Sequence, residues 1–440
     1  MGANLTSLNV STCTSLTSLI AVGSMASVTL PTSLTNLTIT DNTIATFDAT
    51  SLIHLTNLAL RGTSINSLNV TGLTDLKNLT LVGTAVASID VHTCTALTKL
   101  LTGVDNLSVS AIDTSGLTHL KSVNISKSPI TTLDLSSSAS ITSISATSSS
   151  ITTIDMHDTN SLKTISANGS GSFTGFAFPY CTSLNYINVS SCSITDIDVH
   201  SNVNITSIIA PNNPLTNINV SGCISLKKVV IGPDSLSTLD VSGCSSLTEI
   251  GANHSSISVL NMIGANPFGI AVGSTNITEL HAYYMTNLKI LNCTNCTDLT
   301  ALDVTGCNAL TKLYANSCPS LTSLDVSTCA ALTTLTTVGD FTLAALTLST
   351  TPQRRLLYLN STSTILTSLD VSNCYQIKEL LLPGNNLSTS SVNNILSSLD
   401  LAGLRSGYAD VSGGSNGPPS GFGVTAYNNL IAKNWAVYTN

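Results

Sequence analysis

Charged and aromatic side chains are scarce in this 440-residue chain, at 9% and 4% of residues. The formal net charge is −8, which argues against nucleic acid as a partner, because such binding relies on Lys and Arg to neutralise phosphates. Only three Glu are present, and no G-x-S-x-G, H-E-x-x-H or P-loop motif occurs. Without a recognisable catalytic arrangement, we predict neither an enzyme nor a cofactor.

Long apolar segments are also absent. No uninterrupted apolar run reaches 18 residues, so the sequence predicts no membrane insertion. The first residues, MGANLTSLNVSTC, lack a basic stretch followed by an apolar one, so they predict no secretory signal. Three alternatives follow: the protein acts where it is made, it leaves by another route such as a virion, or a signal has been trimmed away.

What the chain does contain is one short phrase repeated along almost its whole length: an aliphatic residue, then usually Asp or Asn, then another apolar residue. It occurs 18 times at intervals of 19 to 23 residues, a period typical of solenoids, in which each copy buries its apolar face against its neighbours. The central residues are Asn9, Thr29, Asp48, Asn69, Asp90, Asp113, Asp134, Asp155, Ala177, Asp198, Asn219, Asp240, Asn261, His281, Asp303, Asp325, Thr347 and Asp370.

Residues 73–94 show how one copy is built, with the pattern L-x-x-L-x-x-L-x-L-x-x-T-x-V-x-x-I-D-V. Apolar residues alternate with a period of two in L-x-L and again in I-D-V, so each is predicted as a short strand with its apolar residues inward. Successive coils then stack in parallel about 4.8 Å apart. The predicted fold is a mainly β repeat solenoid, a rod of about 18 coils with parallel β-sheets on two sides.

Three residues beyond the first strand, each copy has a small residue that is polar or carries a thiol. These are Ser24, Asn42, Thr63, Thr84, Asp105, Ser128, Ser149, Ser170, Cys192, Asn213, Asp234, Ser255, Thr275, Cys296, Cys318, Asp340, Thr362 and Asn385. A short polar side chain at a buried turn can satisfy backbone groups in coil after coil.

The repeat resembles the leucine-rich repeat family, whose signature L-x-x-L-x-L-x-x-N/C-x-L has Asn or Cys at this turn position. Its length is most similar to the short bacterial, internalin-like type, and the resemblance covers about residues 5–387. Ser, Thr or Asp mostly replaces the Asn here, and the second strand is stronger than usual. We therefore expect a flatter rod with two sheets instead of a strongly curved horseshoe.

The period fails from about Ser388. The next apolar residues have helical spacing, at Val392, Ile395, Leu396 and Leu399, behind an N-cap candidate at Ser388 or Thr389. A strand-like GYADVS, a Gly/Pro turn, a helix near 425–433 and a last strand, WAVYTN, follow. We predict a leucine-rich repeat solenoid over residues 1–387 and a small α/β capping module over residues 388–440. The capping module resembles that of leucine-rich proteins from bacteriophages and environmental bacteria.

At the other end, Asn4 enters the first repeat directly. An uncovered sheet edge invites pairing with another chain. Self-association or docking through the N-terminal edge is therefore one hypothesis.

Twelve cysteines are present. Eight sit four residues after the repeated Asp/Asn position, where other copies have residues such as Leu: Cys13, Cys94, Cys181, Cys223, Cys244, Cys307, Cys329 and Cys374. Cys293 and Cys296 form a lone C-x-x-C, two ligands short of a zinc site. We interpret the cysteines as free, buried thiols that fill the core, with a disulfide or a metal as alternatives, and predict no metal site.

The repeated Asp has two interpretations. If the side chains point outward, successive coils present like charges about 5 Å apart, which calcium could bridge. Alternatively, each carboxylate accepts backbone N–H groups in the following turn. Asn shares this capping chemistry and replaces Asp in several copies, so we favour the turn cap.

Lysines gather beside the first strand, in the two variable positions of L-x-x-L, where nine of the eleven lysines occur. The resemblance to leucine-rich repeats implies that this strand lines the ligand-binding side, and nearby tyrosines can stack on sugar rings or partner side chains. The alternative is that Lys only keeps the face soluble. The candidate binding residues are Lys77, Lys99, Lys121, Lys163, Tyr186, Lys227, Lys228, Lys289, Lys312, Tyr314, Tyr358 and Lys378.

These observations predict a non-enzymatic binding or structural protein. The expected setting is a phage virion, in its tail or surface, or an extracellular location where the β-face binds host surface glycans or proteins. A bacterial cell-surface adhesin is one alternative. A self-assembling filament subunit that docks through its N-terminal edge is another.

Overall fold

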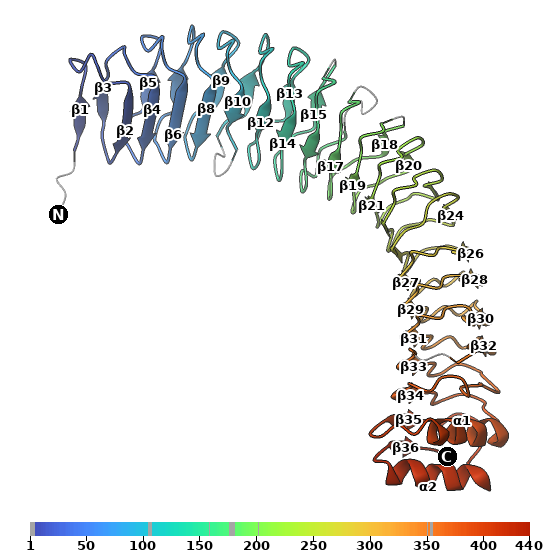
Figure 1. Ribbon diagram of the computed structural model, residues 1–440. Coiled ribbons are helices and arrows are strands. Elements are labelled where there is room, and N and C mark those ends of the chain that lie inside the picture. The colour runs from blue at the N-terminus through green and yellow to red at the C-terminus, as the bar shows by residue number, and fades with distance from the viewer. Residues whose placement is uncertain are drawn as a thin grey trace. The chain divides into compact units, whose positions relative to one another are not determined.

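The computed structural model describes residues 5–103, 108–157, 159–175, 181–200, 202–349, 351–352 and 355–440. The chain is a β-solenoid of about 17 turns, as the repeat predicts. It divides into two compact units, unit 1 up to Cys223 and unit 2 from Ile224, which are described separately. Figure 1 shows the coils of each unit stacked side by side, with two helices at the C-terminal end of unit 2 (Figure 1). Among the described residues, no helix is both long enough and apolar enough to span a membrane.

Each unit has one long parallel sheet, here called the main sheet, built from the L-x-L strand of every coil. In unit 1 its strands are β2 (Ser18–Val22), β4 (Asn36–Thr40), β6 (Asn57–Arg61), β8 (Asn78–Val82), β10 (Lys99–Leu101), β12 (Ser122–Asn124), β14 (Ser143–Ser145), β16 (Thr164–Ser166), β17 (Tyr186–Asn188) and β19 (Ser207–Ile209). In unit 2 they are β21 (Lys228–Val230), β23 (Glu249–Gly251), β25 (Gly269–Ala271), β27 (Ile290–Asn292), β29 (Lys312–Tyr314), β31 (Thr334–Thr336), β33 (Tyr358–Asn360), β34 (Glu379–Leu381), β35 (Tyr408–Asp410) and β36 (Ala436–Tyr438).

The I-D-V strands lie on the opposite side of each coil, here called the second side. In unit 1 they pair two by two: β1 (Ser7–Asn9) with β3 (Ser27–Thr29), β5 (Thr46–Asp48) with β7 (Ser67–Asn69), β9 (Ser88–Asp90) with β11 (Ala111–Asp113), β13 (Thr132–Asp134) with β15 (Thr153–Asp155), and β18 (Asp196–Asp198) with β20 (Asn217–Asn219). In unit 2 the pairs are β22 (Thr238–Asp240) with β24 (Val259–Asn261), β26 (Glu279–His281) with β28 (Ala301–Asp303), and β30 (Ser323–Asp325) with β32 (Ala345–Thr347). The predicted parallel sheets on two sides are confirmed, and those on the second side are short.

The core lies between the two sides and repeats with the coil. In the copy that begins at Leu73, Leu79 and Leu81 point inward from β8 and are 0% exposed, while Ile89 of β9 is 3% exposed. Neighbouring main-sheet strands pair without slippage, so that Leu58 lies beside Leu79 and Leu79 beside Leu100. Burying one such side chain contributes about 1.5–3 kcal/mol. This period-2 pattern fixes which face of each strand is free to vary.

The small polar residues of the turn form a buried hydrogen-bonded ladder. Asn213 Nδ2 donates to the carbonyls of Ala210, in its own coil, and Val189, in the preceding coil, at 3.0 and 2.8 Å. Its Oδ1 accepts the N–H of Ile194 at 3.0 Å. Asn385 makes the same three kinds of bond. The expectation that this slot satisfies buried backbone groups is therefore confirmed at these two positions, whereas Thr63 Oγ1 is buried with no hydrogen-bond partner among the described residues.

Two assignments within this slot were wrong, and one falls outside the described residues. In the first coil the slot is filled by the buried Met25. The Met25 carbonyl accepts the Thr43 N–H from the next coil, just as the Asn42 carbonyl accepts the Ser64 N–H. The predicted Ser24 is exposed. Near the C-terminal end the slot is filled by Thr364 and not by the predicted Thr362. Thr364 is 2% exposed, and its hydroxyl donates to Asn385 Oδ1. Asp105 lies outside the described residues.

All twelve cysteines are free thiols, as predicted, and eleven of them are buried. Cys94 and Cys223 donate to the carbonyls of Val70 and Val199 in the preceding coils at 3.4 and 3.2 Å. Burial raises the pKa of Cys94 to about 11. Cys13 differs from the prediction because it is exposed. It lies in the first of the described coils, so none of the described residues forms a coil before it.

We propose that residues 388–440 form the capping module. Helix α1 (Thr389–Leu401) begins at the N-cap Ser388, whose side chain accepts the Ser391 N–H, and it packs against α2 (Phe422–Ala432). The strands β35 and β36 continue the main sheet of unit 2. Val392, Ile395, Leu396 and Leu399 lie in helix α1, as their spacing predicts, and they are buried. Trp435 is 3% exposed, and its indole N–H donates to Leu404 O at 2.9 Å.

Asp340 is the one fully buried carboxylate among the described residues of the ladder. Its Oδ1 accepts the Cys318 N–H, whereas Oδ2 has no hydrogen-bond partner among the described residues. Burial raises the pKa of Asp340 from 3.8 to about 7. The folded chain therefore binds a proton that the unfolded chain releases. The resulting stabilisation is complete below about pH 4 and is lost as the pH rises to about 7.

We expect Asp340→Asn to remove this pH dependence and to raise the melting temperature at pH 8. Asn fills the same slot at 213 and 385, and its amide can donate where a carboxylate cannot. The pH-dependent term is on the order of a few kcal/mol, at 1.36 kcal/mol per pKa unit. Thermal unfolding at pH 5 and pH 8 measures the effect. The exposed turn cap Asp325→Asn is the matched control, and equal behaviour of the two variants would contradict the assignment.

Candidate functional site

The repeated Asp and Asn of the second side cap the turns that follow their strands. In fourteen copies Oδ1 accepts the backbone N–H of the residue two positions on, at 2.8–3.2 Å. The capping residues are Asn9, Asp48, Asn69, Asp90, Asp113, Asp134, Asp155, Asp198, Asn219, Asp240, Asn261, Asp303, Asp325 and Asp370. The preferred interpretation is confirmed in these copies. Ala177 lies outside the described residues.

Two pairs of these carboxylates face each other on paired strands: Asp90 with Asp113, and Asp134 with Asp155. Like charges directly opposite each other destabilise a sheet. In each pair one Asp is followed two residues later by a histidine, whose Nδ1 lies 2.5 Å from that carboxylate. The histidines, His92 and His157, thus provide positive charge beside both pairs when they are protonated.

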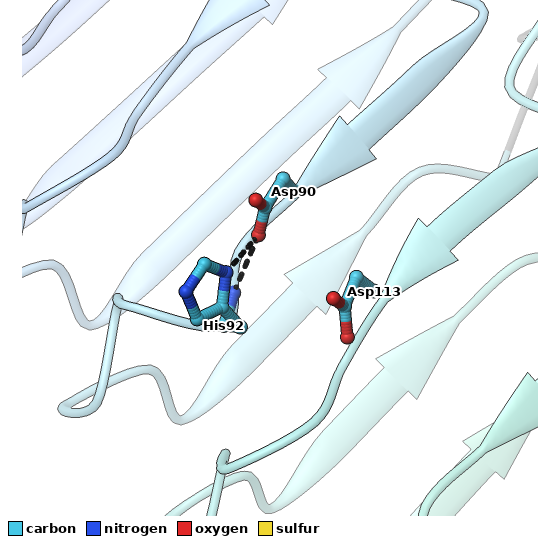
Figure 2. A group of neighbouring side chains, drawn as sticks. All are labelled: Asp90, His92 and Asp113. Carbon is cyan, nitrogen blue, oxygen red and sulfur yellow. Dashed lines mark hydrogen bonds and ion pairs between the residues drawn. The ribbon is translucent and has the colours of Figure 1, made fainter.

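Figure 2 shows Asp90 and His92 in one coil, joined by their hydrogen bonds, with Asp113 facing them from the next coil (Figure 2). One potential ligand atom from each side chain lies within 4.8 Å of the other two, and all three residues are exposed. The hydrogen bond to Asp90, together with its charge, raises the pKa of His92, and Asp113 raises it further. Hydrogen bonds from Ser115 lower the pKa of Asp113. The cluster is accounted for as two turn caps and an ion pair, and the absence of a metal site stays a prediction.

We expect Asp90→Asn to lower the pKa of His92 towards 6.5, because it removes both the charged acceptor and its field. Asp113→Asn should lower it less, because that residue acts only through its charge. An NMR titration of the His92 ring proton measures the shift, with Asp303→Asn in unit 2 as the control. A His92 pKa that is the same in Asp90→Asn and the unmodified protein would refute the ion pair.

The predicted lysine and tyrosine sites all lie on or directly beside the outward face of the main sheets. Lys99, Lys228, Lys312, Tyr186, Tyr314 and Tyr358 are residues of the strands, while Lys77, Lys121, Lys163, Lys227, Lys289 and Lys378 directly precede them. Lys77, Lys99 and Lys121 occupy three successive coils of unit 1 and are exposed. The hydroxyls of Tyr186 and Tyr358 each accept a hydrogen bond from an Asn two residues on, at 3.4 and 3.2 Å. Within each unit the predicted residues are spread over several coils of the main sheet and do not form one compact site.

A hollow of about 700 Å³ opens on the outward face of the unit 2 main sheet. Its floor is formed by β23 and β25, where the outward residues Gly251, Gly269 and Ala271 have little or no side chain. Its walls include Val230, Glu249, Phe268, Ile290, Asn292 and Tyr314. Phe268 and Ile290 are 46% and 39% exposed. The result is an apolar depression in a face that is otherwise largely polar.

Neither glycine of the floor is required by the backbone. Gly251 and Gly269 do not have positive φ angles. A Cβ at Gly251 would meet Val230 at an ordinary 3.5 Å, and one at Gly269 would meet only Ile290 O, at 4.0 Å. Glycine within a strand costs about 0.5–1 kcal/mol relative to Ala and often marks a place where a ligand or another backbone approaches closely. The hollow is therefore maintained at some cost to the strand.

Cations outnumber anions around the hollow. Lys289 Nζ lies 4.8 Å from the centre of the Phe268 ring, and Lys312 is the register neighbour of Ile290. Lys228 pairs with Glu249 at 2.8 Å. Glu249 is the one acidic residue on the outward face between β21 and β31, so Lys227, Lys289 and Lys312 remain unneutralised by acidic neighbours on this face.

Of the residues that line the hollow, Tyr314 is among the predicted binding residues, whereas the glycine floor and the apolar walls are not. The signal of the hollow is visible in the sequence as F-G-I-A at 268–271 and E-I-G at 249–251. The corresponding outward positions of most other coils have Ser, Thr, Asn or Lys. Two glycines and an alanine in adjacent copies of the variable positions could have revealed the missing side chains.

Solved leucine-rich repeat structures are similar to this chain. YopM from Yersinia enterocolitica is 15% identical with a TM-score of 0.52, and the match covers 85% of this chain and 79% of YopM. The protein LIC12759 from Leptospira interrogans is 16% identical with a TM-score of 0.46, covering 84% of this chain and 83% of that one. The functional domain of InlJ from Listeria monocytogenes is 23% identical with a TM-score of 0.39, covering 92% and 74%.

No family model and no curated protein sequence matches the chain. At these levels of identity the structural matches show the fold alone. The chain has the leucine-rich repeat fold, as the turn position and the L-x-x-L-x-L pattern predict.

Proposed function

We propose that this protein is a non-catalytic scaffold that binds another protein through the outward face of its main sheets. The supporting observation is the division of each main-sheet strand into a constant and a variable face. In β29, Leu313 points inward and is 0% exposed, whereas Lys312 and Tyr314 point outward. The equivalent outward residues of β25 are Gly269 and Ala271. Because the inward residues maintain the stacking of the coils, the outward residues can differ between coils without disturbing the fold and can therefore determine which partner binds.

A stacked core makes such a face well suited to binding. Each strand is fixed by parallel pairing to strands of neighbouring coils and by the buried residues behind it. A surface ordered before binding loses little conformational freedom when the partner docks, which leaves more of the contact energy for affinity. We place the partner on a cell surface and the protein in a virion or an extracellular setting, in keeping with the C-terminal resemblance to phage and environmental bacterial proteins.

The proposal predicts that Lys77→Ala, Lys99→Ala and Lys121→Ala together weaken capture of the purified, labelled protein by bacterial cells. The triple variant removes three positive charges from successive coils of the unit 1 face. The control, Ser67→Glu, Ser88→Glu and Thr132→Glu, changes the net charge equally but on exposed positions of the second side. A panel of cell types scored by flow cytometry measures capture. Equal losses in both variants would show only a general charge effect.

Pretreatment of the cells identifies the chemical nature of the ligand. We expect proteinase K to abolish capture and periodate, which cleaves sugar rings with vicinal hydroxyls, to leave it intact. Loss of capture after periodate alone would replace the protein ligand with a glycan. Capture that depends on the second side and not on the lysines would overturn the proposed binding face.

A further inference from the structure

We propose that the hollow on the unit 2 main sheet binds a bulky apolar side chain presented by an acidic segment of a partner protein. This inference rests on the proposed protein-binding function and names the partner chemistry of one part of that face. Three features carry it: the apolar walls, the glycine floor that the backbone does not require, and the excess of cations at the rim.

The walls define the apolar part of the ligand. Phe268 directly precedes the floor strand β25, Ile290 borders the floor from β27, and Val230 borders it from β21. Their exposed apolar surface is removed from water when a ring or branched aliphatic group enters. A hollow of about 700 Å³ has room for one large side chain with its flanking backbone.

The rim defines the charge of the segment around that side chain. Lys289 and Lys312 flank Phe268 and Ile290, and Lys227 directly precedes β21. Glu249 is paired with Lys228 and leaves these lysines unneutralised. The chain as a whole has a net charge of −8. The rim is therefore a local positive patch on an acidic protein, and it attracts carboxylates on either side of the inserted group.

Substitutions at the two floor glycines test the hollow most directly. Gly251→Ser and Gly269→Thr fill the hollow with residue types that occupy equivalent outward positions in other coils, such as Ser145 and Thr164. Both substitutions replace glycine in a strand where a Cβ meets no close contact. They should leave the melting temperature unchanged or raise it. Loss of binding in these variants can then be separated from loss of folding.

The test uses three fluorescent pentapeptides: an acidic peptide with a central Trp, a neutral peptide with a central Trp, and the acidic peptide with Ala in place of Trp. We expect the first to bind the full chain at least roughly tenfold more tightly than the other two by fluorescence anisotropy. Gly251→Ser with Gly269→Thr should abolish that preference. Lys289→Gln with Lys312→Gln should reduce it, together with its salt dependence.

The control, Ile263→Ser with Tyr283→Ser, removes exposed apolar side chains (74% and 53% exposed) from the second side of the same unit and should bind the peptides normally. Equal binding of the three peptides, no binding of any, or unchanged binding by the filled variants would overturn the proposal. An oligogalacturonide of equal charge that binds more tightly would also overturn it, in favour of an acidic glycan. Lysine-dependent capture of cells would survive each of these outcomes, so the broader proposed function is tested separately.

Discussion

The structure depends on hydrogen bonding across coils at a buried turn. An apolar stripe alone would leave the polar backbone of each turn inside the core without partners. Short side chains at this slot supply them: Asn213 joins two coils through three bonds, and Cys296 reaches back to Val272 O at 3.1 Å. Because a small polar or thiol side chain fills the slot in most described copies, it helps to hold successive strands in one register. That register places all variable residues of a unit on one face.

Backbone groups at turns also determine which residues occupy the second side. A capping carboxylate or amide is needed after each I-D-V strand, and the choice between Asp and Asn sets the surface charge there. Where two aspartates face each other, as at Asp90 and Asp113, a histidine accompanies them. Much of this side's polarity is therefore used to build the turns. On the main sheet an outward Asn caps the next turn in some coils, as at Asn124 and Asn292. Other coils have Ser, Gly or Ala at the same outward position, so these residues can vary with the partner.

The sequence was sufficient to predict the repeating part of the molecule. Periodicity gave the two strands per coil, the buried Leu79 and Leu81, the capping role of Asp90 and the buried thiols, because each is set by its position within the copy. It misplaced the slot at Ser24 and Thr362, where the spacing within the copy changes. It also missed the hollow, because Gly251 and Gly269 function through the side chains they lack. A search for lysines and tyrosines finds side chains that are present and therefore cannot detect a hollow that is formed by absent ones.

Site-specific photo-crosslinking tests the central claim, that the outward face of the main sheet meets the partner. A photoreactive phenylalanine derivative would replace Phe268, beside the hollow, or Tyr283 on the second side of the same unit. Each variant would be irradiated while bound to cells. We expect a covalent adduct with a cell-surface protein to form from position 268 and not from position 283. Adducts from position 283 alone would contradict it.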